Sequence, residues 1–268
     1  MCGRFTLTAS MEDIQQHFGV FHVPSAFREV YRPRFNVAPG QDVLTVVAMT
    51  PETLNGARTV AAAGAAPAGG ASPNAGGDLV RTLRWHRWGL IPPWAKEPSI
   101  GYRMINARSE TVAQKPSFRH AFRRRRCLVP ADGFYEWRTE GRRKVPFRFR
   151  MRDGSLFALA GLWETWTPPD GGEPITSCTV LTTDANHVVA PVHHRMPVIV
   201  PPDHYDTWLD QEEEPEALKA LLSPYPPSAM EGYAVSTEVN SARNDYPELI
   251  EPLGTGHESL SVDLRHPE

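Results

Sequence analysis

The chain has 268 residues, 41% of them hydrophobic and 22% charged, with a formal net charge of −3; this is typical of a soluble globular protein with one large domain or two small ones. It holds no apolar run near the ~20 residues of a membrane span and no signal peptide at its start, so we expect no membrane association. Residues 81–150 carry 18 Lys and Arg against 5 Asp and Glu, whereas residues 203–268 carry 3 against 15, so the middle of the chain could face a polyanion unless the acidic end packs against it and neutralises it.

Local patterns predict the elements of the first half. Residues 10–20 predict a short helix with Ser10 as its N-cap, and residues 43–49 and 79–91 predict strands from their β-branched and apolar content. The segment 55–78 between these strands is rich in Ala, Gly and Pro and almost uncharged. We interpret it as a flexible insertion.

The second half predicts mostly strands. Residues 109–126 indicate helical pieces interrupted at Pro116, and 127–164 indicate strands joined by turns at Gly141 and Gly154. Residues 175–183 and 196–200 predict further strands, and 201–210 and 215–222 predict helices. The fold class is therefore α+β, a single domain over residues 2–255 built mainly on antiparallel strands and followed by a polar tail at 256–268.

Cysteine usage is informative in two ways. Cys2, Cys127 and Cys178 show no CxxC spacing, which argues against a disulfide framework or a zinc site and favours a reducing, cytoplasmic compartment. Removal of Met1 would give Cys2 a free α-amine beside its thiol. Such an aminothiol can condense with an aldehyde to form a thiazolidine ring, or attack an amide with the amine as base; an idle buried cysteine is the alternative.

Four further residues are of types suited to proton transfer or hydrogen bonding. Glu136 lies among aromatic residues, which would raise its pKa toward the range useful for acid–base work, unless it is simply an edge-strand carboxylate paired with an arginine. His193 precedes a strand and could move protons near neutral pH or serve a structural role. Asn106 and Arg108 would share one face of a strand. We expect no metal and no cofactor, because adjacent histidines seldom bind one metal and no partner motif is present.

Basic and aromatic residues alternate in several stretches. RHAFRRRR (119–126) and RRKVPFRFR (142–150) could be solvated surfaces, or could bind phosphates and stack on the bases of single-stranded nucleic acid. Trp85, Trp88 and Trp94 could belong to the core or form a stacking platform. Asn36, which precedes a Pro-Gly turn, would ordinarily satisfy backbone groups.

Six motifs together resemble the SRAP (SOS-response-associated peptidase) family: MCGRF, RFNVAPGQ, WGLIPPWA, INARSET, RCLVPADGFYEW and HHRMPVI occur in that order over residues 2–200. The resemblance implies a bifurcated, barrel-like antiparallel core flanked by short helices. It also implies an enzyme that forms a thiazolidine cross-link between Cys2 and abasic sites in single-stranded DNA, acting as a monomer in the cytoplasm or on the nucleoid during the response to DNA damage.

The resemblance also assigns roles. Cys2 would be the cross-linking nucleophile, Asn106 would bind the linked sugar, Glu136 would move protons, and His193 would assist at the sugar oxygen. The residues expected at the DNA are Arg4 and Arg108 on flanking phosphates and Asn36 and Pro39 around the sugar.

One position departs from the family, which commonly reads HDR where this chain has His193-His194-Arg195. Two other functions remain open: a Cys2-dependent thiol peptidase or amidohydrolase, acting on a separate substrate or only on its own leader, and a non-catalytic single-strand binder.

Overall fold

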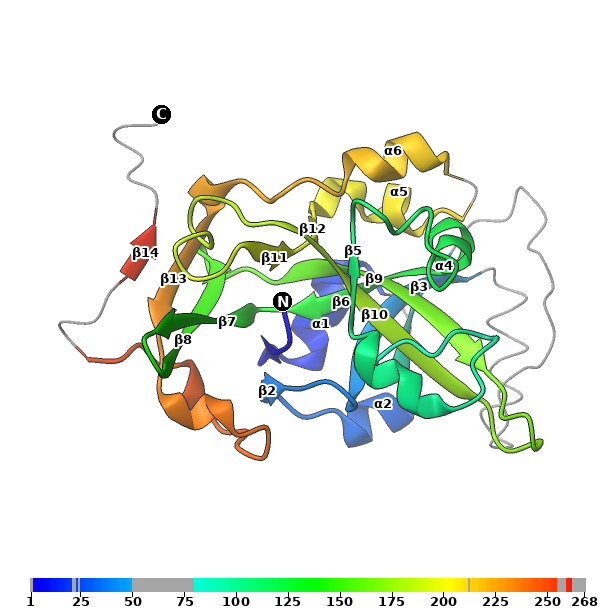
Figure 1. Cartoon of the computed structure of the whole chain (residues 1–268), viewed down its shortest axis with the longest axis horizontal. Helices are drawn as coiled ribbons and strands as arrows, with labels where there is room; N and C mark the ends of the chain where they lie inside the picture. The colour runs from blue at the N-terminus through cyan, green and yellow to red at the C-terminus, as the bar shows by residue number, and fades with distance from the viewer. Residues whose placement is uncertain are drawn as a thin grey trace.

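The computed structural model describes residues 2–20, 23, 25–49, 80–211, 213–254 and 259–261. The insertion expected at 55–78 lies outside these residues. Two β-sheets form the body of the protein, with short helices around them (Figure 1). This confirms the α+β class with mainly antiparallel strands. No helix in the described ranges is long and apolar enough to span a membrane.

The larger sheet closes on itself. Its eight strands follow the order β11-β10-β4-β3-β6-β9-β12, β5 pairs with β10, and β9 also pairs with β10. The strands are β3 (Asp42–Met49), β4 (Val80–Trp88), β5 (Asn106–Arg108), β6 (Arg126–Ala131), β9 (Phe157–Trp166), β10 (Ile175–Asp184), β11 (Arg195–Pro197) and β12 (Ile199–Val200). The ring β10-β4-β3-β6-β9 is the expected barrel-like core, and closure removes free sheet edges.

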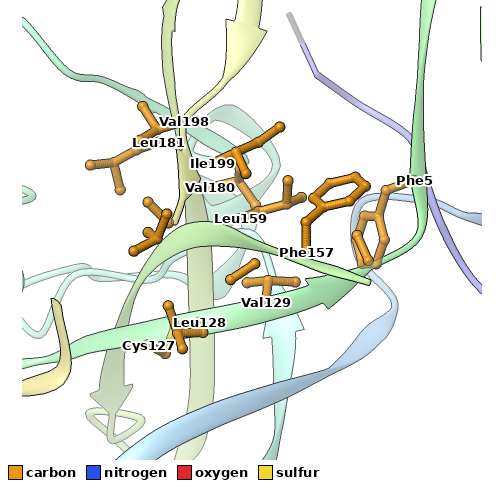
Figure 2. Close-up of a cluster of buried hydrophobic side chains, with 14 of the residues drawn as sticks. Phe5, Cys127, Leu128, Val129, Phe157, Leu159, Val180, Leu181, Val198 and Ile199 are labelled. Carbon is orange, nitrogen blue, oxygen red and sulfur yellow. The ribbon is translucent and has the colours of Figure 1, made fainter. Parts of the chain in front are cut away.

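Buried aliphatic side chains fill this core. Figure 2 shows Leu128 and Val129 of β6, Leu159 of β9 and Val180 of β10 in one cluster with Phe5 from the other sheet. Each is at most 2% exposed. Such residues contribute about 1.5–3 kcal/mol apiece when fully buried, so the ring is a firm support for whatever its strand ends carry.

The second sheet has six strands in the order β14-β13-β8-β7-β1-β2, all antiparallel. They are β1 (Phe5–Leu7), β2 (Arg34–Val37), β7 (Gly133–Glu140), β8 (Arg143–Met151), β13 (Met230–Ala234) and β14 (Ser259–Ser261). The predicted turns at Gly141 and Gly154 are present, with φ of 58° and 74°, a backbone region that favours glycine. Within the segment 256–268 that we expected to be a polar tail, β14 is an edge strand.

The expected strand at 196–200 is two short strands. β11 pairs with β10 and β12 pairs with β9, and Val198 between them bonds to both sides: its N–H donates to Leu181 (2.9 Å) and its carbonyl accepts from Ala160 (2.9 Å). The segment therefore passes from one neighbour to the other, a change of partner that no local pattern could indicate.

Short helices cover the sheets. The α-helices are α1 (Met11–Phe18), α2 (Ser25–Val30), α4 (Arg119–Arg124), α5 (Tyr205–Leu209) and α6 (Pro215–Ala220), and the 3-10 helices include η1 (Pro98–Arg103), η2 (Pro202–His204), η3 (Pro227–Ala229), η4 (Thr237–Asn240) and η5 (Pro247–Ile250). α1 confirms its predicted cap: Ser10 and Asp13 form a capping box, and Gly19 ends the helix in the left-handed conformation. The stretch 109–118 is a series of turns, so only α4 is helical in the range 109–126.

Asp132 marks the point where the chain leaves β6 in one sheet and enters β7 in the other. Its carboxylate pairs with Arg148 (3.1 Å) and accepts the hydroxyl of Thr8 (2.7 Å) and that of Thr6. Arg148 is only 4% exposed and also donates to Tyr233 (2.9 Å). This buried network fixes how the two sheets meet, which decides where the start of the chain lies.

Candidate active site

The start of the chain runs beside strand β7. Phe5 of β1 lies opposite Phe134 of β7, and because the pairing is antiparallel, residues before Phe5 run alongside those after Phe134. This places Cys2 near Glu136. Cys2 is fully buried, with its Sγ 3.9 Å from the carbonyl oxygen of Arg4. In Figure 1 the N-terminus lies centrally, between β7 and the strands of the larger sheet.

Asn106 comes to Cys2 from the larger sheet. It begins β5, which pairs in parallel with β10, with Asn106 opposite Val180. The Asn106 Nδ2 donates to the Cys2 carbonyl at 2.8 Å. Its Oδ1 is buried and accepts no hydrogen bond within the part of the chain that the structure describes. An unfilled buried acceptor is unfavourable, so this oxygen is ready to accept a donor from a ligand or from the Cys2 amine.

Glu136 and His193 face each other across the two sheets. Glu136 is 2% exposed on β7, and its Oε2 lies 3.9 Å from Nδ1 of His193. His193 sits in the loop before β11, where its N–H donates to Val189 (3.0 Å) and the N–H of Arg195 donates to its Nδ1 (3.0 Å). The structure thus brings together all four residues predicted to be catalytic.

Burial sets the protonation of these groups. Loss of hydration raises the pKa of Glu136 from 4.5 to about 7, so near neutral pH this carboxyl can both accept and release a proton. Burial, reinforced by the negative charge of Glu136, raises the pKa of the Cys2 thiol. Burial also lowers the pKa of His193. The group therefore combines a protonated thiol, a neutral imidazole and a carboxyl poised to exchange protons.

Arg4 and Asn36 hold a C-terminal loop against the start of the chain. The Arg4 guanidinium donates to Asn36 Oδ1 (2.8 Å) and to the carbonyls of Val239 (2.7 Å) and Asn240 (3.2 Å). The Asn36 amide donates to Val239, Ser241 and Asn244 carbonyls. Asn36 is fully buried, so it satisfies backbone groups, as asparagine beside a turn ordinarily does, and shapes the site by fixing this loop.

The other predicted DNA residues lie nearer the surface. Pro39 is half-buried in the turn between β2 and β3, and Arg108 is exposed at the end of β5. The three tryptophans differ in exposure. Trp88 belongs to the core and is 1% exposed, Trp85 is half-buried, and Trp94 is 58% exposed. Tyr102, at 63%, is also exposed.

The basic segment is only partly free to meet a polyanion. Arg126 and Arg148 are buried, and Arg81 and Arg150 pair with Asp206 (2.6 Å) and Glu231 (2.8 Å) from the acidic end of the chain. The acidic end therefore neutralises part of the basic segment, as one of the two interpretations expected. The exposed cationic residues of segment 81–150 include Arg103, Arg108, Lys115, Arg119, Arg123, Arg142, Arg143 and Lys144.

Sequence reasoning missed the loop that closes the site. Asp245 Oδ1 accepts the N–H groups of Phe35 (2.6 Å) and Asn36 (3.1 Å), and Asn240 accepts the indole N–H of Trp137 (2.6 Å). Each contact joins residues at least 100 positions apart. The segment carries no local pattern that marks it; it was simply part of an acidic C-terminal region.

No group of three or more His, Cys, Asp or Glu side chains in the described ranges is arranged to hold a metal ion. The three cysteines are free thiols and all are buried.

These features place Cys2 against Asn106 and near the Glu136–His193 pair, between two sheets, and the family follows from comparison. The family model described as "SOS response associated peptidase (SRAP)" matches residues 1–242. The chain belongs to the SRAP family, which confirms the resemblance seen in its motifs.

Named relatives and solved structures agree. The abasic site processing protein YoqW of Bacillus subtilis is 42% identical over 254 residues, covering 94% of this chain and 99% of YoqW. The abasic site processing protein HMCES of Gallus gallus is 38% identical over 201 residues, 66% of this chain and 59% of HMCES. A crystal structure from Bacteroides thetaiotaomicron has the same fold, with a TM-score of 0.75 at 22% identity over 94% of this chain and all of that one.

Proposed function

We propose that this protein processes abasic sites in single-stranded DNA by forming a thiazolidine cross-link through Cys2. The observation that carries the proposal is the placement of Cys2 against Asn106 and beside the Glu136–His193 pair. The relatives named abasic site processing proteins supply the substrate class. An abasic deoxyribose opens to an aldehyde, which is the electrophile that a 1,2-aminothiol captures.

The reaction balances with the residues present. Once Met1 has been removed, the Cys2 amine adds to C1′ of the aldehyde and the resulting carbinolamine loses one water to give an imine. The thiol sulfur then bonds to the same carbon while the thiol proton passes to the imine nitrogen, closing the five-membered ring. The product is protein plus DNA less one water, and no oxidant or reductant is needed.

Glu136 is the proton carrier in this scheme. With a pKa of about 7, its carboxyl can protonate the departing hydroxyl of the carbinolamine and, once ionised, accept the thiol proton. Asn106 would hold the Cys2 residue through its carbonyl and offer its unfilled Oδ1 to a sugar hydroxyl or the ring nitrogen. His193 would donate a hydrogen bond to the sugar ring oxygen as the ring opens.

The DNA backbone would be bound by arginine. Arg108 is exposed beside Asn106, and Arg4 is two residues from Cys2 with its guanidinium fixed by the C-terminal loop. Pro39 would border the sugar, and exposed Trp94 offers a face for a flanking base. Contacts to backbone and lesion carry little sequence information, so we expect little base preference.

The protonated thiol favours cross-linking over peptide hydrolysis. A cysteine hydrolase attacks as thiolate, and burial raises the pKa of the Cys2 thiol, which makes that state unfavourable. In the cross-linking scheme the amine attacks first, and the thiol adds afterwards to an activated carbon. The same site can therefore form a thiazolidine without a thiolate at rest.

A denaturing gel tests the proposal. The protein is mixed with a single-stranded oligonucleotide carrying one abasic site, alongside Cys2→Ala and an intact oligonucleotide. We expect a heat-stable shifted band that requires both Cys2 and the lesion, at about one adduct per protein. Turnover of a peptide substrate without a band would instead favour the hydrolase, and equal non-covalent binding by Cys2→Ala without a band would favour a plain single-strand binder.

A further inference from the structure

His194 lies directly on His193. The two imidazole rings are stacked, with centroids 4.4 Å apart and planes 28° from parallel. The backbone holds both residues in place, because the His194 carbonyl accepts from Ala185 N–H (3.1 Å) and His193 N–H donates to Val189 (3.0 Å). His194 is exposed and His193 is half-buried, so the outer ring covers one face of the inner ring.

The backbone of Arg195 selects one tautomer of His193. Its N–H donates to Nδ1 of His193 at 3.0 Å. An amide nitrogen has a fixed hydrogen, so Nδ1 must act as acceptor and the proton of the neutral ring must be on Nε2. The Arg195 carbonyl lies 3.1 Å from the same Nδ1. That oxygen would be the partner of a protonated Nδ1, but the amide hydrogen directed at Nδ1 opposes a proton there.

Charged groups from several elements face His193. Glu136 on β7 is 3.9 Å away and favours the charged ring, whereas Lys144 on β8 and a positive charge on His194 oppose it. The guanidinium of Arg195 donates to the carboxylates of Glu110 and Asp184 (2.8 Å), so its charge is largely offset. The balance at His193 is therefore sensitive to the sign of the charge at position 194.

We propose that His194 is a positioning residue for His193, and that its stacked ring keeps the imidazole in place as the neutral form with its proton on Nε2. This inference rests on the proposed function, in which that proton is the hydrogen bond to the sugar ring oxygen. An acid at position 194 would carry a negative charge and would have no ring to stack.

Side-chain nitrogen NMR of the full chain, followed over pH, tests the inference without any DNA. We expect the His193 ring of the wild type to be neutral near pH 7 with its proton on Nε2. His194→Asp should raise the midpoint of the His193 titration by about one pH unit, which is the order expected when a charge some 4 Å away is introduced near water. His194→Phe retains an aromatic face and should retain the tautomer.

His187→Asp is the matched control, because His187 is exposed in the same loop and undergoes the same change of charge. A His193 midpoint that does not move in His194→Asp, or that moves equally in His187→Asp, would overturn the inference. So would a wild-type ring with its proton on Nδ1.

Cross-linking rates measured on the same proteins separate the two proposals. We expect His194→Asp to be slower than wild type at about pH 6, where its His193 is charged, and closer to wild type at about pH 8. His194→Phe should follow the wild-type profile. Failure of the wild type to cross-link at all would contradict the proposed function, and the NMR titration would still decide the role of His194.

Discussion

Replacing Glu136 by glutamine should stabilise the protein at alkaline pH while it abolishes proton transfer. Burial raises the pKa of this carboxyl from 4.5 to about 7, so the folded chain binds a proton that the unfolded chain releases between these values. The stabilisation that this bound proton gives the wild type is therefore fully present below pH 4.5 and is lost as pH rises to about 7. A difference of about 2.5 pH units corresponds to about 3 kcal/mol.

Urea unfolding of both proteins at about pH 4.5 and about pH 8 measures this difference. We expect the free energy of unfolding of Glu136→Gln, relative to that of wild type, to be about 3 kcal/mol higher at the alkaline pH than at the acidic pH. The control is Glu140→Gln, on the exposed end of the same strand, which should show no such pH dependence. Equal stability differences at both pH values would show that Glu136 titrates normally, and would refute its role as the proton carrier.

Three further predictions test the contacts that hold the C-terminal loop and the two sheets in place, and the contact with DNA. Asn36→Ala leaves loop carbonyls unpaired and should cost about 1–3 kcal/mol, with faster hydrogen exchange across residues 236–246; unchanged exchange there would show that Asn36 does not hold the loop. Arg148→Met leaves the Asp132 carboxylate buried without its cation and should cost about 3–5 kcal/mol in urea unfolding, whereas exposed Arg142→Met should cost under about 0.5 kcal/mol. Non-covalent binding of single-stranded DNA by Cys2→Ala should fall steeply with salt, and Arg108→Ala should flatten that slope by about 0.7; a slope unchanged by Arg108→Ala would place its side chain away from the phosphates.

Elements whose cause is local were predictable from the sequence. The N-cap at Ser10 depends on the few residues that follow it, and it formed as expected. The turns at Gly141 and Gly154 join neighbouring strands, so a tight connection between β-rich stretches was sufficient to place them. The family motifs also pointed to the three residues that lie near Cys2, namely Asn106, Glu136 and His193, because each motif contains its own residue whatever the fold.

Contacts over long sequence distances were not predictable. The pairing of β9 with β10, which closes the ring, depends on the whole set of strands. The hydrogen bond from the Asn36 N–H to the Asp245 carboxylate joins residues more than 200 positions apart. Trp88 and Trp94 belong to one motif, yet one is core and the other is exposed; their burial depends on what the tertiary structure places over them, which residue type alone does not indicate.

The central claim is that Cys2 uses both its amine and its thiol on one aldehyde carbon. The most direct measurement is the intact mass of the purified adduct, followed by counting its alkylatable thiols after denaturation. The chain has three cysteines, all free. A thiazolidine predicts a mass equal to protein without Met1 plus DNA less one water, two reactive thiols, and no gain of mass with borohydride. Three reactive thiols and a borohydride-reducible bond would reveal an imine only, and would contradict the account.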